Sequence, residues 1–191
     1  AGAVKLKDIS GPKGIPDGKI SPEYDKVVQG QTTPKWIGGF TNTFTWKDLT
    51  LSVFIQTVQG VKKANDLYCI ASDELGRRNT PVDLGYWTPE NKSNEFKSLS
   101  PNSNPYFYSF PKNASFTRIK DITLSYNIPQ SLLNKTRLGG LTLYVSGRNL
   151  FTFTDWLGWD PESVQVGRGS SNDGLNYPMV KSYVFGLNVT F

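Results

Sequence analysis

The sequence contains no histidine and only one cysteine, Cys69. The lack of histidine excludes the catalytic triads, metal sites and proton relays that depend on imidazole. A single cysteine cannot form a disulfide within the chain, so we expect Cys69 to be an ordinary buried or loop residue. Scattered carboxylates are the only support for a glycoside hydrolase, and the sequence therefore predicts a protein that is not an enzyme.

Long apolar runs are also missing. No stretch reaches the roughly 18 apolar residues of a membrane-spanning helix, which excludes a helical membrane protein. Only 37% of the residues are hydrophobic, although 13% are aromatic. Barrel strands are apolar on one face only, so this composition is compatible with a membrane β-barrel. The net charge of +5 comes from scattered lysines and arginines, so we expect solvated loops and no nucleic-acid partner.

What the chain does contain is alternation of apolar and polar residues, which has the period of a half-buried strand. It occurs in residues 36–46, 49–59, 116–128, 141–153 and 181–191. In the last segment the residues of one face are all apolar: Tyr183, Phe185, Leu187, Val189 and Phe191. The other face is polar or small except for Val184. This pattern is typical of a membrane barrel strand, with its apolar face toward lipid.

The connections between these segments alternate in length. Lys47-Asp48 is a two-residue turn, and a short connection after Pro129 contains a possible helical turn over residues 130–135. Residues 61–115 and 154–180 are long and rich in Gly, Pro, Asn and Ser. Outer-membrane barrels alternate short periplasmic turns with long extracellular loops in this way.

The sequence therefore predicts an all-β fold, an antiparallel portion of a transmembrane barrel with about five strands. Its parts would be extracellular loops at 1–35, 61–115 and 154–180, hairpins at 36–60 and 116–153, and a terminal strand at 181–191. Barrels of one chain need at least about eight strands, so we expect the remainder of a larger barrel as a partner, together with outer-membrane lipid.

Shared apolar faces also predict the register of both hairpins. Trp46 would face Leu49 and Phe44 would face Leu51, while Ile128 would face Leu141 and Leu124 would face Val145. The second register places Asp121 opposite Arg148, which predicts an ion pair on the lumen side; two independently solvated charges are the alternative. Arg118 and Lys120 share the parity of Ile122, so we expect both on the lipid face, reaching toward the headgroups.

Motifs along nearly the whole chain resemble those of SusC/RagA-like TonB-dependent transporters of Bacteroidota. In order they are Asp17-Gly-Lys-Ile20, Gly30-Gln-Thr-Thr-Pro-Lys-Trp-Ile-Gly-Gly-Phe40, Trp87-Thr-Pro-Glu-Asn91, Ala114-Ser-Phe-Thr-Arg-Ile-Lys-Asp-Ile-Thr-Leu-Ser-Tyr-Asn-Ile-Pro129, Tyr144-Val-Ser-Gly-Arg-Asn-Leu-Phe-Thr-Phe-Thr154, Gly158-Trp-Asp-Pro-Glu162, Tyr177-Pro178 and Phe185-Gly-Leu-Asn-Val-Thr-Phe191.

The resemblance implies the C-terminal part of a plugged barrel of about 22 strands in a Gram-negative outer membrane. It implies TonB-dependent uptake of glycan or peptide fragments, with a SusD-like surface lipoprotein as a lid. The family's plug domain and TonB-contacting segment have no counterpart in these residues. The resemblance also implies that the terminal strand ending at Phe191 is the barrel-assembly signal. A soluble β-sandwich that binds carbohydrate is the alternative, because it too would show alternation and aromatic residues.

Three kinds of candidate site remain open. Family members carry an acidic loop that resembles a calcium site, which makes Asp8, Asp17 and Asp25 candidate calcium ligands; a plain surface turn is the alternative, and no other cofactor is implied. The aromatic residues of the long loops could stack on substrate, or could instead be a girdle or loop packing: Trp87, Tyr106, Tyr108, Trp156 and Trp159. Asp160-Pro161-Glu162 is typical of a turn, although its carboxylates could form an acid/base pair.

Overall fold

A computed structural model describes residues 1–64, 85–100, 111–158, 160–162 and 178–191. The chain divides into two compact units. One consists of Ala1–Gln31 and Lys62–Lys112, and the other consists of Thr32–Val61 and Asn113–Phe191. Trp159, Tyr106 and Tyr108 lie outside the described residues.

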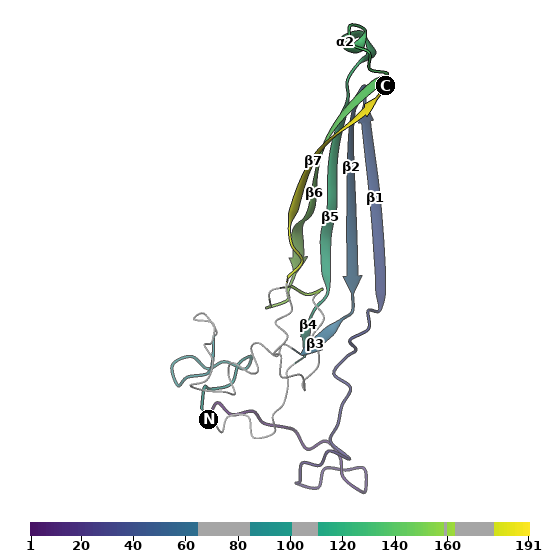
Figure 1. The fold of residues 1–191 in the computed structure, drawn as a ribbon. Coiled ribbons are helices and arrows are strands. Elements are labelled where there is room, and N and C mark those ends of the chain that lie inside the picture. Colours follow the sequence, from purple (N-terminus) through teal and green to yellow (C-terminus); the bar gives the residue numbers. More distant parts are fainter. Residues whose placement is uncertain (65–84, 101–110, 159, 163–177) are drawn as a thin grey trace, which may run out of the picture. The chain divides into compact units, whose positions relative to one another are not determined.

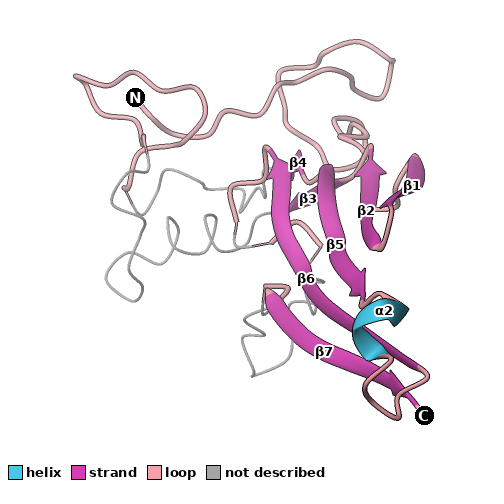
Figure 2. Cartoon of the chain, turned by 90° about the horizontal axis from the view of Figure 1, so that it is seen from above, coloured by secondary structure: helices cyan, strands magenta, loops and turns pink. Residues whose placement is uncertain are grey.

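The second unit is built on one antiparallel sheet of five strands (Figure 1). The strands pair in the order β1-β2-β5-β6-β7, and Figure 2 shows them following a curve from β1 to β7. Their bounds are Trp36–Trp46 for β1, Leu49–Gln59 for β2, Phe116–Asn127 for β5, Gly140–Thr154 for β6 and Ser182–Thr190 for β7. The five segments predicted from alternation are therefore confirmed, to within one residue at each end.

Directly opposed residues of an antiparallel pair share a face, and the register collects apolar residues on one face of all five strands. One row across the sheet is Phe44, Leu51, Leu124, Val145 and Phe185. The next is Trp46, Leu49, Tyr126, Leu143 and Leu187. These pairs confirm the predicted hairpin registers. A slip of one residue would have turned each apolar set to the other face.

The opposite face carries polar and small residues. A row between the two apolar rows is Thr45, Thr50, Ser125, Tyr144 and Gly186. A further row is Thr43, Ser52, Thr123, Ser146 and Val184. One face of the sheet is thus mainly apolar and the other mainly polar; Asn42 is an exception on the apolar face, and Phe54 and Val184 are exceptions on the polar face.

The apolar face is uncovered. Phe185 is 79% exposed and Trp46 is 70% exposed. In the described part of the chain, the only buried hydrophobic residues are Val61, Ala114, Phe116 and Leu133, and none of them belongs to the two apolar rows. A β-sandwich would cover such a face with a second sheet. The described residues of this unit form no such second layer, which counts against the soluble sandwich alternative.

The two short connections have the expected form. Trp46 faces Leu49 across the Lys47-Asp48 turn, and Lys47 has φ of 53°. Between β5 and β6, the short helix α2 spans Gln130–Leu133 and buries Leu133, which confirms the predicted helical turn. Both turns and the end of β7 lie at the same end of the sheet (Figure 1). Within the described ranges, the structure has no helix whose length and apolar character would let it span a membrane.

The prediction that Arg118 and Lys120 lie on the lipid face is wrong, because β5 contains a β-bulge at Lys120. Lys120 is skipped in the register of β5 with both β2 and β6, where Ile119 and Asp121 are the paired residues on either side. A bulge residue interrupts the alternation of a strand. Arg118 consequently pairs with Gln56 and lies on the polar face, although simple alternation assigned it to the face of Ile122.

The first unit is made mostly of loops. Strands β3 (Lys62–Ala64) and β4 (Pro111–Asn113) form a two-stranded sheet, and Tyr86 forms an isolated bridge with Phe96. The amide of Ser98 donates a hydrogen bond to the carbonyl of Gly2. Its N-terminal turns are organised by the side chains of Asp8, Asp17 and Asp25, which accept backbone hydrogen bonds.

Candidate functional site: an ion-pair network on the polar face

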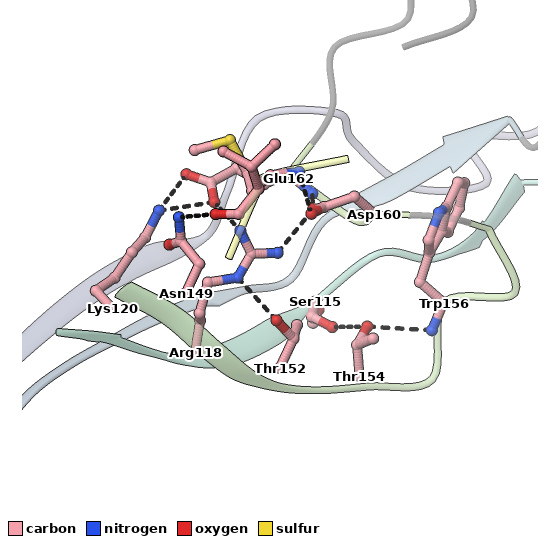
Figure 3. Close-up of polar contacts among 11 residues, drawn as sticks. Ser115, Arg118, Lys120, Asn149, Thr152, Thr154, Trp156, Asp160 and Glu162 are labelled. Carbon is pink, nitrogen blue, oxygen red and sulfur yellow. Dashed lines mark hydrogen bonds and ion pairs between the residues drawn. The ribbon is translucent and has the colours of Figure 1, made fainter. Parts of the chain in front are cut away.

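The most buried polar side chain in the described part of the chain is Arg118, on β5 beside the bulge. Its side chain is 1% exposed. It donates hydrogen bonds from Nε to Thr152 Oγ1 at 2.9 Å, from Nη1 to Glu162 Oε2 at 2.8 Å and from Nη2 to Asp160 Oδ1 at 2.7 Å (Figure 3). The guanidinium also lies 5.2 Å from the centre of the Phe116 ring. A buried charge requires such partners, because leaving it unpaired would cost several kcal/mol.

Lys120 completes this network. Its Nζ donates to Glu162 Oε1 at 2.9 Å and to Oε2 at 2.8 Å. The bulge turns Arg118 to the polar face, where Arg118 and Lys120 both donate to the carboxylate of Glu162. Two cations and two carboxylates therefore meet on the polar face. We call Arg118, Lys120, Asp160 and Glu162 the Arg118 network.

Asp160 connects three segments of the chain. Its Oδ1 accepts from Arg118 and from the amide of Glu162 at 2.8 Å, and its Oδ2 accepts from the amide of Met179 at 2.9 Å. Burial acts to raise the pKa of Asp160, but the Glu162 amide, the Arg118 guanidinium and the Met179 amide together hold that pKa below its ordinary value. Asp160 is therefore an ionised structural acceptor.

This arrangement bears on the alternatives for Asp160-Pro161-Glu162. An acid/base pair requires one carboxyl that keeps its proton near neutral pH. Asp160 has a lowered pKa, and Glu162 accepts from two cations. The contacts are those of a turn stabilised by ion pairs. A partial indication of this site is present in the sequence, where Arg118 and Lys120 lie in one short motif and Asp160 and Glu162 in another. Nothing in the sequence indicates that the two motifs contact each other.

Asp121 and Arg148 are directly opposed on the same polar face, as the hairpin register predicts. Arg148 Nε lies 3.5 Å from Asp121 Oδ2, and the arginine side chain is 64% exposed. Asp121 also accepts hydrogen bonds from Thr123 Oγ1 at 2.6 Å and from Ser146 Oγ at 3.0 Å. The two charges are thus paired, within a cluster that includes two hydroxyl groups.

The three candidate calcium ligands each accept backbone hydrogen bonds. Asp25 binds the amides of Ser21, Ile9 and Ser10; the Ser21 amide contributes most to holding its pKa below the ordinary value. Asp8 Oδ2 accepts from the Gly18 amide at 2.5 Å, while its Oδ1 is shielded from solvent and has no hydrogen-bond partner. Asp17 accepts from the Lys19 amide. Among the described residues, no three metal-binding side chains are grouped around one point.

The described aromatic candidates lie in different units. In the first unit, the ring of Trp87 lies against Gly2, where a Cβ would overlap it. In the second unit, Trp156 follows β6, and its amide donates to Thr154 Oγ1 at 3.1 Å (Figure 3). The ring of Trp156 lies against Gly158. Both rings therefore pack locally. The residues of the expected assembly signal are exposed on the apolar face or beyond it, from 37% for Val189 to 93% for Phe191.

Comparison with known proteins identifies the family to which the chain belongs. The chain is 32% identical over 183 residues to TonB-dependent receptor P3 of Formosa agariphila, an alignment that covers 92% of this chain and 18% of the relative. It is also 32% identical over 209 residues to TonB-dependent receptor P26 of the same organism, which covers 100% of this chain and 20% of the relative. The chain thus spans about a fifth of the length of these relatives. No protein-family model matches it.

Solved structures agree with this assignment. The RagAB peptide transporter has a TM-score of 0.72 and 27% identity, covering 97% of this chain and 20% of the solved chain. The RagAB peptide importer in its open-open state has a TM-score of 0.66 and 29% identity. These matches agree with the prediction of a non-enzymatic protein. The chain is therefore a portion of a TonB-dependent receptor, a family of outer-membrane β-barrels, and it is homologous to the corresponding part of the RagAB importer.

Proposed function

We propose that the chain forms the C-terminal part of the barrel in a SusC/RagA-like importer. The single observation that carries this proposal is the apolar face of the sheet, which is continuous across all five strands and uncovered. A face of this kind is stable when it contacts lipid, and the opposite polar face suits a hydrated or plugged lumen. The free edges of β1 and β7 would then pair with the remaining strands of the barrel.

The proposed orientation follows from the connections. The Lys47-Asp48 turn and α2 would face the periplasm, and residues 1–35, 61–115 and 154–180 would be extracellular loops. The polar face would line the lumen, so the ion pair of Asp121 with Arg148 would be a lumen ion pair. The mostly buried Arg118 network would lie at the extracellular end of the same face. Its position away from lipid supports this orientation, since charges on the lipid face are costly.

The proposed activity is TonB-dependent uptake of peptide or glycan fragments. RagAB is a peptide importer, and the likeness to it favours peptides over glycans as the cargo. A SusD-like surface lipoprotein would cover the extracellular mouth. Energy would come from TonB, through a part of the receptor that lies outside these 191 residues. The polar face contributes hydroxyl, amide and charged groups to the passage.

The test is uptake by cells in which the gene for the receptor containing this chain is deleted. Labelled oligopeptides and labelled oligosaccharides are offered in parallel, with a strain lacking TonB as the control. We expect the deletion to abolish accumulation of one class of fragment to the same extent as loss of TonB. Unchanged uptake of both classes, with the lipoprotein partner still present, would refute the proposed activity.

A further inference from the structure

The Arg118 network joins parts of the chain that are far apart in sequence. Arg118 and Lys120 belong to β5, whereas Asp160 and Glu162 follow β6 by several residues. Through the Met179 amide, Asp160 also holds the segment that leads into β7. A second contact acts on that segment, because Asn149 Nδ2 donates to the carbonyl of Val180 at 3.1 Å (Figure 3). Both ends of the connection between β6 and β7 are thus attached to the sheet.

The attachment combines ion pairs with one buried apolar residue, Pro161. Asp160 has a side-chain exposure of 6%, and its partner Arg118 one of 1%, whereas Met179 is 44% exposed and Val180 is 76% exposed. The apolar residues of the segment before β7 are therefore not buried against the sheet. Buried ion pairs are screened by salt much less than exposed ones, and the two positive and two negative charges of the network balance.

We propose that Arg118 is a positioning residue that anchors the connection between β6 and β7 onto the polar face of the sheet. Residues Asp160–Glu162 and Met179–Val180 then form a fixed wall on that face instead of the base of a free outer loop. The anchoring follows from the contacts of this unit alone. That the wall borders the transport passage rests on the proposed function.

Two amides report directly on the anchor, because Glu162 and Met179 both donate to the carboxylate of Asp160. Hydrogen exchange measured at residue resolution on the whole receptor in detergent therefore provides the test. In the Arg118→Gln variant we expect both amides to exchange about tenfold faster or more, while the amides of β5 and β6 stay protected. Unchanged exchange of Glu162 and Met179 would overturn the proposal.

Arg148→Gln is the matched control. It makes the same substitution on the same face of the sheet, at an arginine that is paired with Asp121 and not with the network. We expect it to leave exchange at Glu162 and Met179 unchanged. If it accelerates those amides as much as Arg118→Gln does, the anchor is not specific to Arg118 and the proposal fails.

If Arg118→Gln disrupts the barrel, amides throughout β5 lose their protection from exchange. A second variant then provides the test. Asp160→Asn keeps the shape of the side chain but loses its charge. With the strands protected, faster exchange at Met179 supports the anchor and unchanged exchange overturns it. This readout needs no transport, so a receptor that imports neither peptides nor glycans would refute the proposed function and leave the anchor standing.

Discussion

The ring of Tyr144 on β6 lies directly over Gly186 on β7, its partner in the sheet, and fills the space that a Cβ at that position would occupy. Both residues are on the polar face, in the row that contains Ser125 and Thr50. A glycine in the interior of a strand weakens it. Here the glycine leaves room for the aromatic ring, which covers the exposed backbone.

The first prediction concerns this pair. Gly186→Ala places a methyl group inside the ring of Tyr144, and we expect a loss of about 1–3 kcal/mol in the free energy of unfolding from overpacking. Gly140→Ala on β6 is the control, because a Cβ there meets Thr190 at 3.7 Å, an ordinary contact. Thermal unfolding in detergent compares the stability of the two variants. Equal losses for the two variants would show that the position of Tyr144 is not the cause.

A charge on the apolar face provides the second prediction. Val53→Arg places a cation in the row of Ile122, and we expect it to cost about 2–4 kcal/mol near the middle of the bilayer. Ser52→Arg, one residue away but in the row of Thr123, should cost much less. Folding into lipid vesicles from urea gives the two free energies. If Ser52→Arg is the more damaging change, the assignment of the two faces is reversed.

The two arginines of the polar face should differ in their contribution to stability. Arg148 is 64% exposed beside Asp121, and exposed ion pairs contribute about 0–1 kcal/mol, so Arg148→Gln should change the free energy of unfolding by no more than that. Arg118→Gln leaves the buried carboxylate of Asp160 without its cation, for which we expect a loss of about 3–5 kcal/mol. Chemical unfolding of both variants tests the ranking, and similar losses would contradict it.

Asp25 makes the N-terminal turns of the first unit sensitive to acid. The amides of Ser21 and Ile9 hold the pKa of Asp25 below its ordinary value, so the fold favours the carboxylate. The stabilisation is complete above the unfolded pKa of about 3.9, and it is lost as the pH falls through the lower folded pKa. We expect the Ser21 amide to lose protection from exchange only in that acid range.

Asp25→Asn should remove that pH dependence and leave the turns less protected at neutral pH. Asp17→Asn is the matched control, because Asp17 accepts a single amide, from Lys19, in an exposed turn. The same acid-induced loss of protection in the Asp25→Asn variant would show that another group is responsible.

The fold was predictable from the sequence wherever alternation alone decides it. The sequence predicts that Phe44 lies opposite Leu51, because this register places both residues on the apolar face, and the structure has that register. The position of Arg118 was not predictable in this way, because alternation fails at the bulge. Lys120 carries no conformational signal such as glycine, and the bulge depends on how β5 pairs with two neighbours at once.

One local signal does accompany the bulge. Asn149, on the stretch of β6 opposite Lys120, has φ of 53°, a conformation in which asparagine is enriched among residues other than glycine. Its presence in an otherwise alternating strand indicates an irregularity. It does not indicate that Asp160 and Glu162 would reach the strand, because that contact depends on a connection with no periodic pattern of its own.

The proposed membrane barrel depends most on which face of the sheet meets lipid. The direct measurement labels single cysteines at Leu124 and Thr123, neighbours on the central strand β5, in the whole receptor with Cys69 replaced by serine and reconstituted in vesicles that contain spin-labelled lipid. We predict strong quenching of a fluorophore at position 124 and weak quenching at position 123. Weak quenching at position 124, or equal quenching at both, would contradict a membrane barrel that turns its apolar face to lipid.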